Sequence, residues 1–246
     1  MNSMTSILLI SNSTVHGKGY LDHVEAELLD LLDSRKKIAF IPFALYDRNR
    51  YFTQVSSRLS RIGLQVTSVH DISNARRVVR EADAIFVGGG NTFRLLKGLH
   101  EWNLIESIRE RVNAGVPYIG SSAGSIVAGP SLKTTKDMPV VQPPSFDALG
   151  LVPFQVSPHF LDPDPSSTHM GETQEERINQ FLEENEAPVL GLREGSFVRI
   201  REEKTTLLGP NTARIFRRGH EPVEAPSGSD LAQLLSSAVL LEGRAA

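Results

Sequence analysis

The sequence predicts an α/β fold, a doubly wound and mostly parallel sheet flanked by helices. Short runs rich in Val, Ile, Leu and Phe alternate with stretches whose apolar residues recur at helical spacing. Some of these runs are apolar throughout, such as AIFV at residues 84–87, which is typical of strands buried on both faces. Because strand, helix and strand follow one another repeatedly, parallel pairing with crossover helices is the expected arrangement.

The first half of the chain carries this alternation. Five strands are expected, at residues 6–11, 37–42, 65–69, 84–87 and 117–120. Helices are expected between them, at residues 23–32, 51–62, 74–82, 91–99 and 104–113. The repeated order places the carboxyl ends of several strands at one edge of the sheet, where ligands bind in such folds.

The second half is less regular, and it predicts a short antiparallel C-terminal extension. Residues 131–142 carry few helical signals, and residues 153–168 are rich in Pro, Asp and Ser, which predicts a long loop. Helices are expected at residues 174–184 and 229–237, short strands at 189–192, 197–201, 205–208 and 214–217, and a frayed tail from 242. Since no linker stands out, residues 1–246 are expected to form one domain.

Composition excludes several classes of function. The net charge of −3 gives no general attraction to nucleic acid or to an anionic membrane. The N-terminus lacks a basic region before its four-residue apolar stretch, so no signal peptide is expected, and no segment reaches the roughly 20 apolar residues that span a bilayer. A cytoplasmic location is therefore expected. The absence of cysteine rules out disulfides, thiolate zinc sites and cysteine nucleophiles.

The stretch YIGSSAGSIVAG contains the motif G-x-S-x-G, with Ser122 at its centre. An apolar strand precedes it and an apolar segment follows it, which is the strand–turn–helix setting of a nucleophile elbow. Such a turn is tight, so it requires small residues on both sides of the nucleophile. Ser121 stands one position too early for this role. A plain Gly/Ser turn and a phosphate-binding turn are the alternatives.

A second glycine-rich turn, VGGGNTFRLL, follows the strand at 84–87. Its three glycines would allow the backbone to approach a ligand closely, so it is a candidate for the second donor of an oxyanion hole. Asn91 or Thr92 could cap the following helix. A turn without a ligand and a nucleotide site are the alternatives, although neither G-x-G-x-x-G nor the P-loop pattern is matched.

A serine nucleophile requires a base and an acid that orients the base. Of the seven histidines, His159 is favoured because it follows an apolar strand and precedes a long loop, and His169 is second. Glu194, just past another apolar strand, is the candidate acid. Its competitors are Asp137, Asp162 and Glu172. The metal-binding motif H-E-x-x-H is absent, so no metal is expected.

These residues resemble peptidase E, the aspartyl dipeptidase family of serine peptidases. The resemblance extends from residue 8 to about residue 222 and rests on LLISNST, IPFA, VGGGNTFRLLK, YIGSSAG, TTKDMPVV, SPHF, HMGET and LREGS. It implies a glutamine-amidotransferase-like fold and a triad of Ser122, His159 and Glu194. It further implies an oxyanion hole formed by the N–H groups of Gly90 and Ala123, no metal or cofactor, and hydrolysis of dipeptides with N-terminal aspartate.

Other positions of the family pattern are expected to bind the substrate or shape the site: Asp137, Asn91 and Gln174. Gln174 is a departure, because the family commonly has arginine there, which could pair bidentately with a substrate carboxylate. Lys136 is a second departure, since TTKD replaces the more usual TTND. Lys136 and Arg193 are the candidate cations that could compensate for the missing arginine.

The sequence therefore predicts a serine dipeptidase that acts on short peptides, with an altered preference for aspartate. One alternative is a related hydrolase of β-aspartyl or other acidic peptides, similar to cyanophycinase. Another is a non-catalytic protein that binds a small molecule on the same fold. The expected partner is a small peptide substrate, and the chain is expected to be a monomer or a homodimer.

Overall fold

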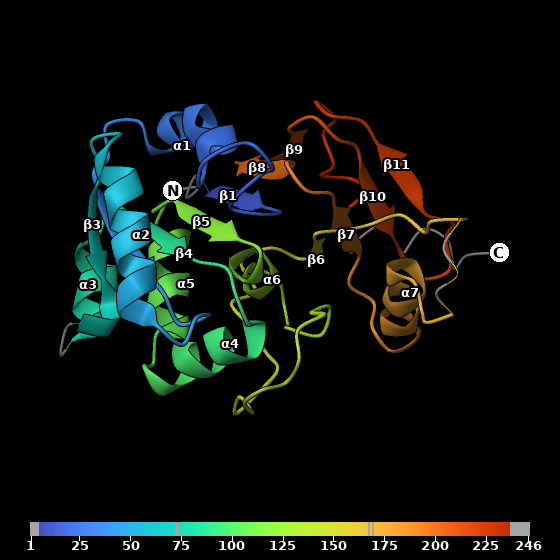
Figure 1. The fold of residues 1–246 in the computed structure, drawn as a ribbon, viewed down its shortest axis with the longest axis horizontal. Coiled ribbons are helices and arrows are strands. Elements are labelled where there is room, and N and C mark those ends of the chain that lie inside the picture. The colour runs from blue at the N-terminus through green and yellow to red at the C-terminus, as the bar shows by residue number, and fades with distance from the viewer. Residues whose placement is uncertain (1–4, 72–73, 167, 169, 237–246) are drawn as a thin grey trace.

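The computed structural model describes residues 5–71, 74–166, 168 and 170–236, which form two sheets side by side (Figure 1). The larger sheet has the order β3-β2-β4-β5-β1-β8-β9. Its strands are β1 (Ser6–Ile10), β2 (Lys37–Ile41), β3 (Gln65–Ser68), β4 (Ala84–Val87), β5 (Tyr118–Ser121), β8 (Phe197–Arg201) and β9 (Lys204–Leu208). The smaller sheet has the order β11-β10-β7-β6. Its strands are β6 (Gln155–Pro158), β7 (Val189–Leu192), β10 (Ala213–Phe216) and β11 (Val223–Ala225).

The strands of the first half of the chain are parallel, as expected, and most strands of the second half are antiparallel to their neighbours. Strands β1 to β5 pair in parallel, whereas β8 and β9 add to β1 as antiparallel strands. In the smaller sheet β6 and β7 are parallel, and β10 and β11 are antiparallel. The α/β fold with a mostly parallel sheet is confirmed, and the antiparallel extension is divided between the two sheets.

Helices cover both faces of the larger sheet. They are α1 (Glu25–Leu32), α2 (Arg48–Ser60), α3 (Ala75–Glu81), α4 (Thr92–Glu101), α5 (Ile105–Asn113) and α6 (Ala123–Ala128), with short 3-10 turns η1 (Asp22–Val24) and η2 (Val69–Asp71). Alternate strand residues point to opposite faces. Leu8 and Phe40 therefore join α1 and α2 in one apolar cluster, whereas Ile7, Leu9 and Ile85 join α3 to α6 in another.

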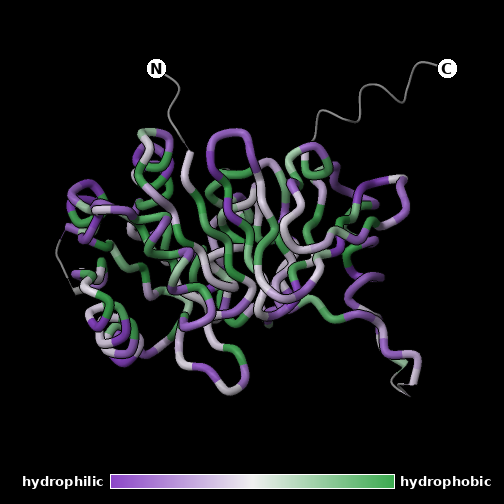
Figure 2. Tube along the Cα trace, turned by 90° about the horizontal axis from the view of Figure 1, so that it is seen from above, coloured by the Kyte–Doolittle hydropathy of each residue, from purple (hydrophilic) through white to green (hydrophobic). Residues whose placement is uncertain are grey.

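The smaller sheet also has two covered faces. Helix α7 (Gln174–Glu184) packs its Ile178 and Phe181 against Phe160 and Phe216 on one side. On the other side, Val156 and Leu190 belong to the same apolar cluster as Leu9 of the larger sheet. Apolar strands lie in the interior and polar residues gather in the connecting loops (Figure 2). The prediction of a single domain stays a prediction.

Two expectations about the second half are wrong. The loop expected at 153–168 contains β6, whose four buried residues pair with β7 and whose last residue is Pro158. The helix expected at 229–237 does not form within its described part, up to residue 236. Asp230 instead accepts hydrogen bonds from the N–H groups of Thr205 and Ala232, which holds this segment at the start of β9. The frayed tail predicted from 242 lies outside the described residues.

No helix in the described ranges combines the length and the apolar character needed to cross a bilayer.

Candidate active site

Ser122 lies at the sharp turn between β5 and α6, with backbone angles φ 51° and ψ −109°. A residue with a side chain rarely adopts such a positive φ, so the turn is strained. The Ser122 N–H donates to the carbonyl of Ile10 at the end of β1, at 2.9 Å, and this bond helps to hold the turn. Ser121 is fully buried and outside the hydrogen-bonded group described below, which agrees with the choice of Ser122 as the exposed hydroxyl.

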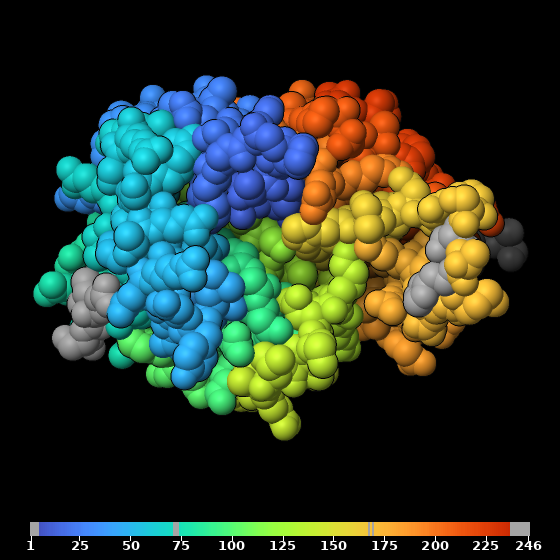
Figure 3. Space-filling view, in the orientation of Figure 1, coloured from blue at the N-terminus to red at the C-terminus, as the bar shows by residue number. Residues whose placement is uncertain are grey.

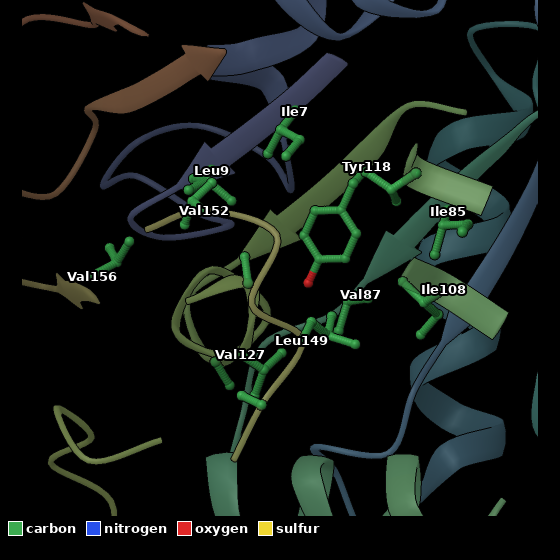
Figure 4. Packing of buried hydrophobic residues seen from close by; sticks show 14 of the residues in the cluster. Ile7, Leu9, Ile85, Val87, Ile108, Tyr118, Val127, Leu149, Val152 and Val156 are labelled. Atoms are coloured by element: carbon green, nitrogen blue, oxygen red, sulfur yellow. The ribbon is translucent and has the colours of Figure 1, made fainter. Parts of the chain in front are cut away.

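The glycines of the motif are required by close packing. A Cβ atom at Gly120 would lie 2.5 Å from the carbonyl oxygen of Gly124, and one at Gly124 would overlap the carbonyl of Val87. Tyr118, for which the sequence indicated no role, points from β5 into the apolar cluster beside Val87 (Figure 4). Its hydroxyl donates to the Gly124 carbonyl at 2.7 Å, and burial raises the pKa of Tyr118 well above its usual range. A tyrosine in an apolar strand just before the elbow was the available signal.

The three predicted triad residues form one continuous chain of hydrogen bonds. Ser122 Oγ lies 2.9 Å from His159 Nε2, and His159 Nδ1 lies 2.6 Å from Glu194 Oε1. His159 follows β6 and has φ 52°, so it too is a strained non-glycine residue. Glu194 follows β7, beside β6 in the smaller sheet. The nucleophile thus comes from one sheet, and the other two groups come from the second.

The glycine-rich turn after β4 lies against the elbow. A Cβ atom at Gly89 would be 3.1 Å from the Cβ of Ser122, so the two backbones approach closely. Gly90 has φ 132°, and a Cβ there would lie 2.8 Å from the carbonyl of Ala44. Within the described residues, the N–H groups of Gly90 and Ala123 donate no hydrogen bond to the protein. Both amides therefore remain available to an oxygen beside Ser122.

Asp137 and Asn91 hold the start of α4 rather than the histidine. One Asp137 oxygen accepts from the N–H and the hydroxyl of Thr92, at 2.7 and 2.6 Å, and from the Thr135 hydroxyl at 3.1 Å. Asn91 caps α4 through the N–H of Arg94, and its amide donates to the carbonyl of Met138. The two residues thereby fasten the loop after α6 to the glycine-rich turn, which is a site-shaping role.

Lys136 and Gln174 meet behind His159. The Lys136 ammonium donates to the carbonyl of Pro158 at 2.7 Å, to that of His159 at 3.2 Å and to Gln174 Oε1 at 3.0 Å. The Gln174 amide also donates to the His159 carbonyl and accepts from the N–H of Leu161. Burial of the ammonium lowers the pKa of Lys136 to about 8, against the opposing effect of the Asp137 carboxylate.

The other candidate cation is engaged elsewhere. Arg193 binds both oxygens of Asp162 and both oxygens of Glu224, and these carboxylates raise its pKa. It therefore anchors the chain after His159 and has no free donor pair for a substrate. The competing acid Asp162 belongs to this cluster. Glu172 pairs instead with Arg177 and Gln180, and His169 lies outside the described residues.

Figure 3 shows the surface above this site hollowed at its centre, where the segment around residue 120 lies below its neighbours. A separate cavity of about 80 Å³ is lined by Lys136 and Gln174, which bind the His159 carbonyl, and by Lys133 and Arg177 among others. In the described part of the chain, no group of three His, Asp or Glu side chains could hold a metal ion. That no metal or cofactor takes part stays a prediction.

Comparison with known proteins identifies the family. The model of peptidase family S51 matches residues 7–208. Peptidase E of Streptomyces coelicolor is 52% identical over 94% of this chain and 95% of its own length. A Drosophila melanogaster protein named "Probable alpha-aspartyl dipeptidase" is 47% identical over 96% of this chain and 99% of its own.

Solved structures agree on the fold. A peptidase from an acI-B1 Actinobacterium superposes with a TM-score of 0.69 over 94% of this chain and 98% of its own, at 18% identity. The resemblance seen in the motifs is thus confirmed over nearly the whole chain. The chain belongs to peptidase family S51.

Proposed function

We propose that this protein is a serine dipeptidase that removes an N-terminal acidic residue from short peptides. The observation that carries the proposal is the continuous chain from Ser122 through His159 to Glu194, built at a strained elbow beside two free amides. The relatives named peptidase E and alpha-aspartyl dipeptidase support the substrate class.

The geometry suits acyl transfer through a covalent intermediate. His159 takes the proton of Ser122 as the hydroxyl attacks the peptide carbonyl, and Glu194 holds the imidazole in the required tautomer. The oxyanion is stabilised by the N–H groups of Gly90 and Ala123, and losing one such donor typically costs about 100- to 1,000-fold in rate. His159 then protonates the leaving amine, and water activated by the same imidazole hydrolyses the acyl-enzyme.

Lys136 supplies the positive charge that favours an acidic substrate. It lies against Gln174, so a cation occupies the neighbourhood where the family commonly has arginine. Lys133 and Arg177 line the same cavity as Lys136 and add to the positive potential. All three protons of the Lys136 ammonium are hydrogen-bonded to the protein. Lys136 therefore attracts an acidic substrate through its charge and makes no bidentate hydrogen bonds with it. Discrimination between Asp and other acidic residues is therefore weaker than an arginine would give.

A panel of dipeptides tests this function. With α-Asp, β-Asp, Glu, Asn and Ala at the N-terminus and a common second residue, kcat/KM is expected to be highest for α-Asp and next for Glu. Preference for β-Asp would favour the cyanophycinase-like alternative. If no dipeptide is cleaved and a fluorophosphonate does not label Ser122, the alternative of a non-catalytic protein that binds a small molecule would be favoured.

The specificity for acidic substrates is expected to depend on pH through Lys136. Its pKa of about 8 means that the ammonium is charged below this pH and neutral above it. The ratio of kcat/KM for Asp-Ala to that for Ala-Ala should fall about fivefold to tenfold as pH rises through 8, the effect of losing ~1 kcal/mol of Coulomb attraction. Lys136→Met should give a low ratio at every pH.

Using the ratio of two substrates removes the titrations that both share, including that of the peptide amine. The charged groups that face Lys136 are Asp137, Glu194 and Arg177. A ratio that stays constant with pH in the wild-type protein would show that Lys136 plays no part in selecting acidic substrates.

A further inference from the structure

The end of β1 touches the backbone beside each triad residue, although it contributes no triad residue itself. The carbonyl of Ile10 accepts the N–H of Ser122 at 2.9 Å. The hydroxyl of the next residue, Ser11, accepts the N–H of His159 at 2.9 Å. The side-chain oxygen of Asn12 accepts the N–H of Gly195, directly after Glu194, at 2.7 Å. Three consecutive residues thus hold three separate segments of the site.

Ser11 joins the two strands that carry the base and the acid. While it accepts from His159, its hydroxyl donates to the carbonyl of Leu192, the last residue of β7, at 2.8 Å. A serine hydroxyl can donate once and accept at the same time, so both capacities are used here. The side chain is fully buried, and water is therefore not at hand to replace either bond.

Asn12 completes the connection on the side of the acid. It is 3% exposed, and its amide donates to the carbonyl of Thr14 at 2.8 Å, which orients its oxygen toward Gly195. The carbonyl of Glu194 is held separately by the Asn211 amide at 2.8 Å. Both bonds hold the same peptide group, which joins Glu194 to Gly195. The backbone directly after the Glu194 side chain is therefore fixed before any substrate binds.

We propose that Ser11 and Asn12 are positioning residues that align the base and the acid with the nucleophile, an inference that rests on the proposed function. The alignment is needed because Ser122 follows a strand of the larger sheet, whereas His159 and Glu194 follow strands of the smaller one. Ser122 and His159 also occupy strained conformations, which persist only where the surroundings enforce them. Displacing reacting groups by about 1 Å can cost roughly 100-fold in rate.

Ser11→Ala removes both bonds and leaves the N–H of His159 buried without this acceptor. It is expected to lower kcat about 10- to 100-fold, with KM within about twofold of the wild-type value, because no substrate contact is lost. Ser11→Thr, which keeps the hydroxyl, should recover most of the activity. Ser11→Cys, nearly isosteric but a weaker donor and acceptor, should fall between them and carries the test if the alanine variant does not fold.

The matched control is Ser131→Ala. Ser131 is also a buried serine with two hydrogen bonds, from Gln155 Nε2 at 2.6 Å and from the Lys133 N–H at 3.3 Å, but neither holds a triad residue. It should lose stability in urea to a similar degree as Ser11→Ala while keeping the wild-type kcat. A structural role alone for Ser11 would make the two variants behave alike.

Two readouts remain informative even without a known substrate. The rate of fluorophosphonate labelling at Ser122 reports activation of the nucleophile, and the far-downfield proton resonance of His159 reports its bond to Glu194. Both should be diminished in Ser11→Ala and unchanged in Ser131→Ala. Wild-type labelling and resonance in folded Ser11→Ala would overturn the proposal. If wild-type protein is labelled but cleaves no dipeptide, the proposed substrate fails while the positioning role stands.

Discussion

Replacing Ser122 by alanine is expected to lower kcat for dipeptide hydrolysis about a millionfold, with the fold intact. Alanine keeps the Cβ atom, so the strained elbow is unchanged, and the hydroxyl has one hydrogen bond to the protein, to His159. His159→Ala should cost about as much, because removing either member of such a unit disables the whole. The measurement is kcat on the best dipeptide of the panel, with urea unfolding of each variant.

The chain offers a matched control for this experiment. Ser121 is the neighbouring serine, and its fully buried hydroxyl has no hydrogen-bond partner within the described residues. Ser121→Ala should therefore keep activity within about threefold of the wild type, since it removes no polar contact. Combining Ser122→Ala with His159→Ala should add little to either loss. Dipeptide hydrolysis that survives in Ser122→Ala would contradict the assignment of the nucleophile.

Much of the site could be predicted because of how parallel strands are arranged. Ser122 and Gly90 follow β5 and β4, parallel strands of the larger sheet whose carboxyl ends lie at one edge. His159 follows the apolar run that forms β6 in the smaller sheet. The motif around Ser122 predicted a serine nucleophile, and the positions of other residues at strand ends predicted the candidates for its partners. Glu194 was found in the same way, since it follows β7, which is parallel to β6.

The parts that could not be predicted depend on contacts between distant residues. The sequence around Arg193 does not indicate that two carboxylates bind it. Asp162 lies 31 positions before it and Glu224 lies 31 positions after it. The composition of residues 153–168 predicted a long loop, but β6 lies within it and pairs with β7. Asp230 likewise binds β9 in place of starting a helix. In each of these three places, contacts with residues far away in the sequence determine the local structure.

Two residues of the site, Ser122 and His159, have strained backbone conformations. Six non-glycine residues in the described part of the chain have positive φ, and two of them are Ser122 and His159, the pair between which a proton would pass. Each such residue costs of order 1–3 kcal/mol, which the surrounding structure must offset. Hydrogen bonds supply part of that stabilisation. The N–H groups of Ser122 and His159 donate to the Ile10 carbonyl and the Ser11 hydroxyl. The His159 carbonyl accepts from Lys136 and Gln174.

The second large effect is expected at Glu194. Glu194→Gln keeps the size of the side chain but loses the charge that stabilises an imidazolium, and its amide can face His159 Nδ1 and favour the wrong tautomer. A loss of kcat of about 1,000- to 10,000-fold is expected, with KM little changed. Because the carboxylate is more than half exposed, solvent screening places the effect below that of a fully buried acid.

Asp137→Asn is the decisive comparison, since Asp137 is the other acid that could complete the triad. Its oxygen holds Thr92 at the start of α4, and asparagine keeps an oxygen that can accept the same bonds. We expect a loss of stability of about 0.5–2 kcal/mol in urea and less than about tenfold in kcat. If Asp137→Asn abolished turnover while Glu194→Gln retained it, the bond between His159 and Glu194 would not be the one that catalysis uses. The opposite result would assign the acid to the loop after β7, where Asn12 and Asn211 together hold the peptide group that joins Glu194 to Gly195.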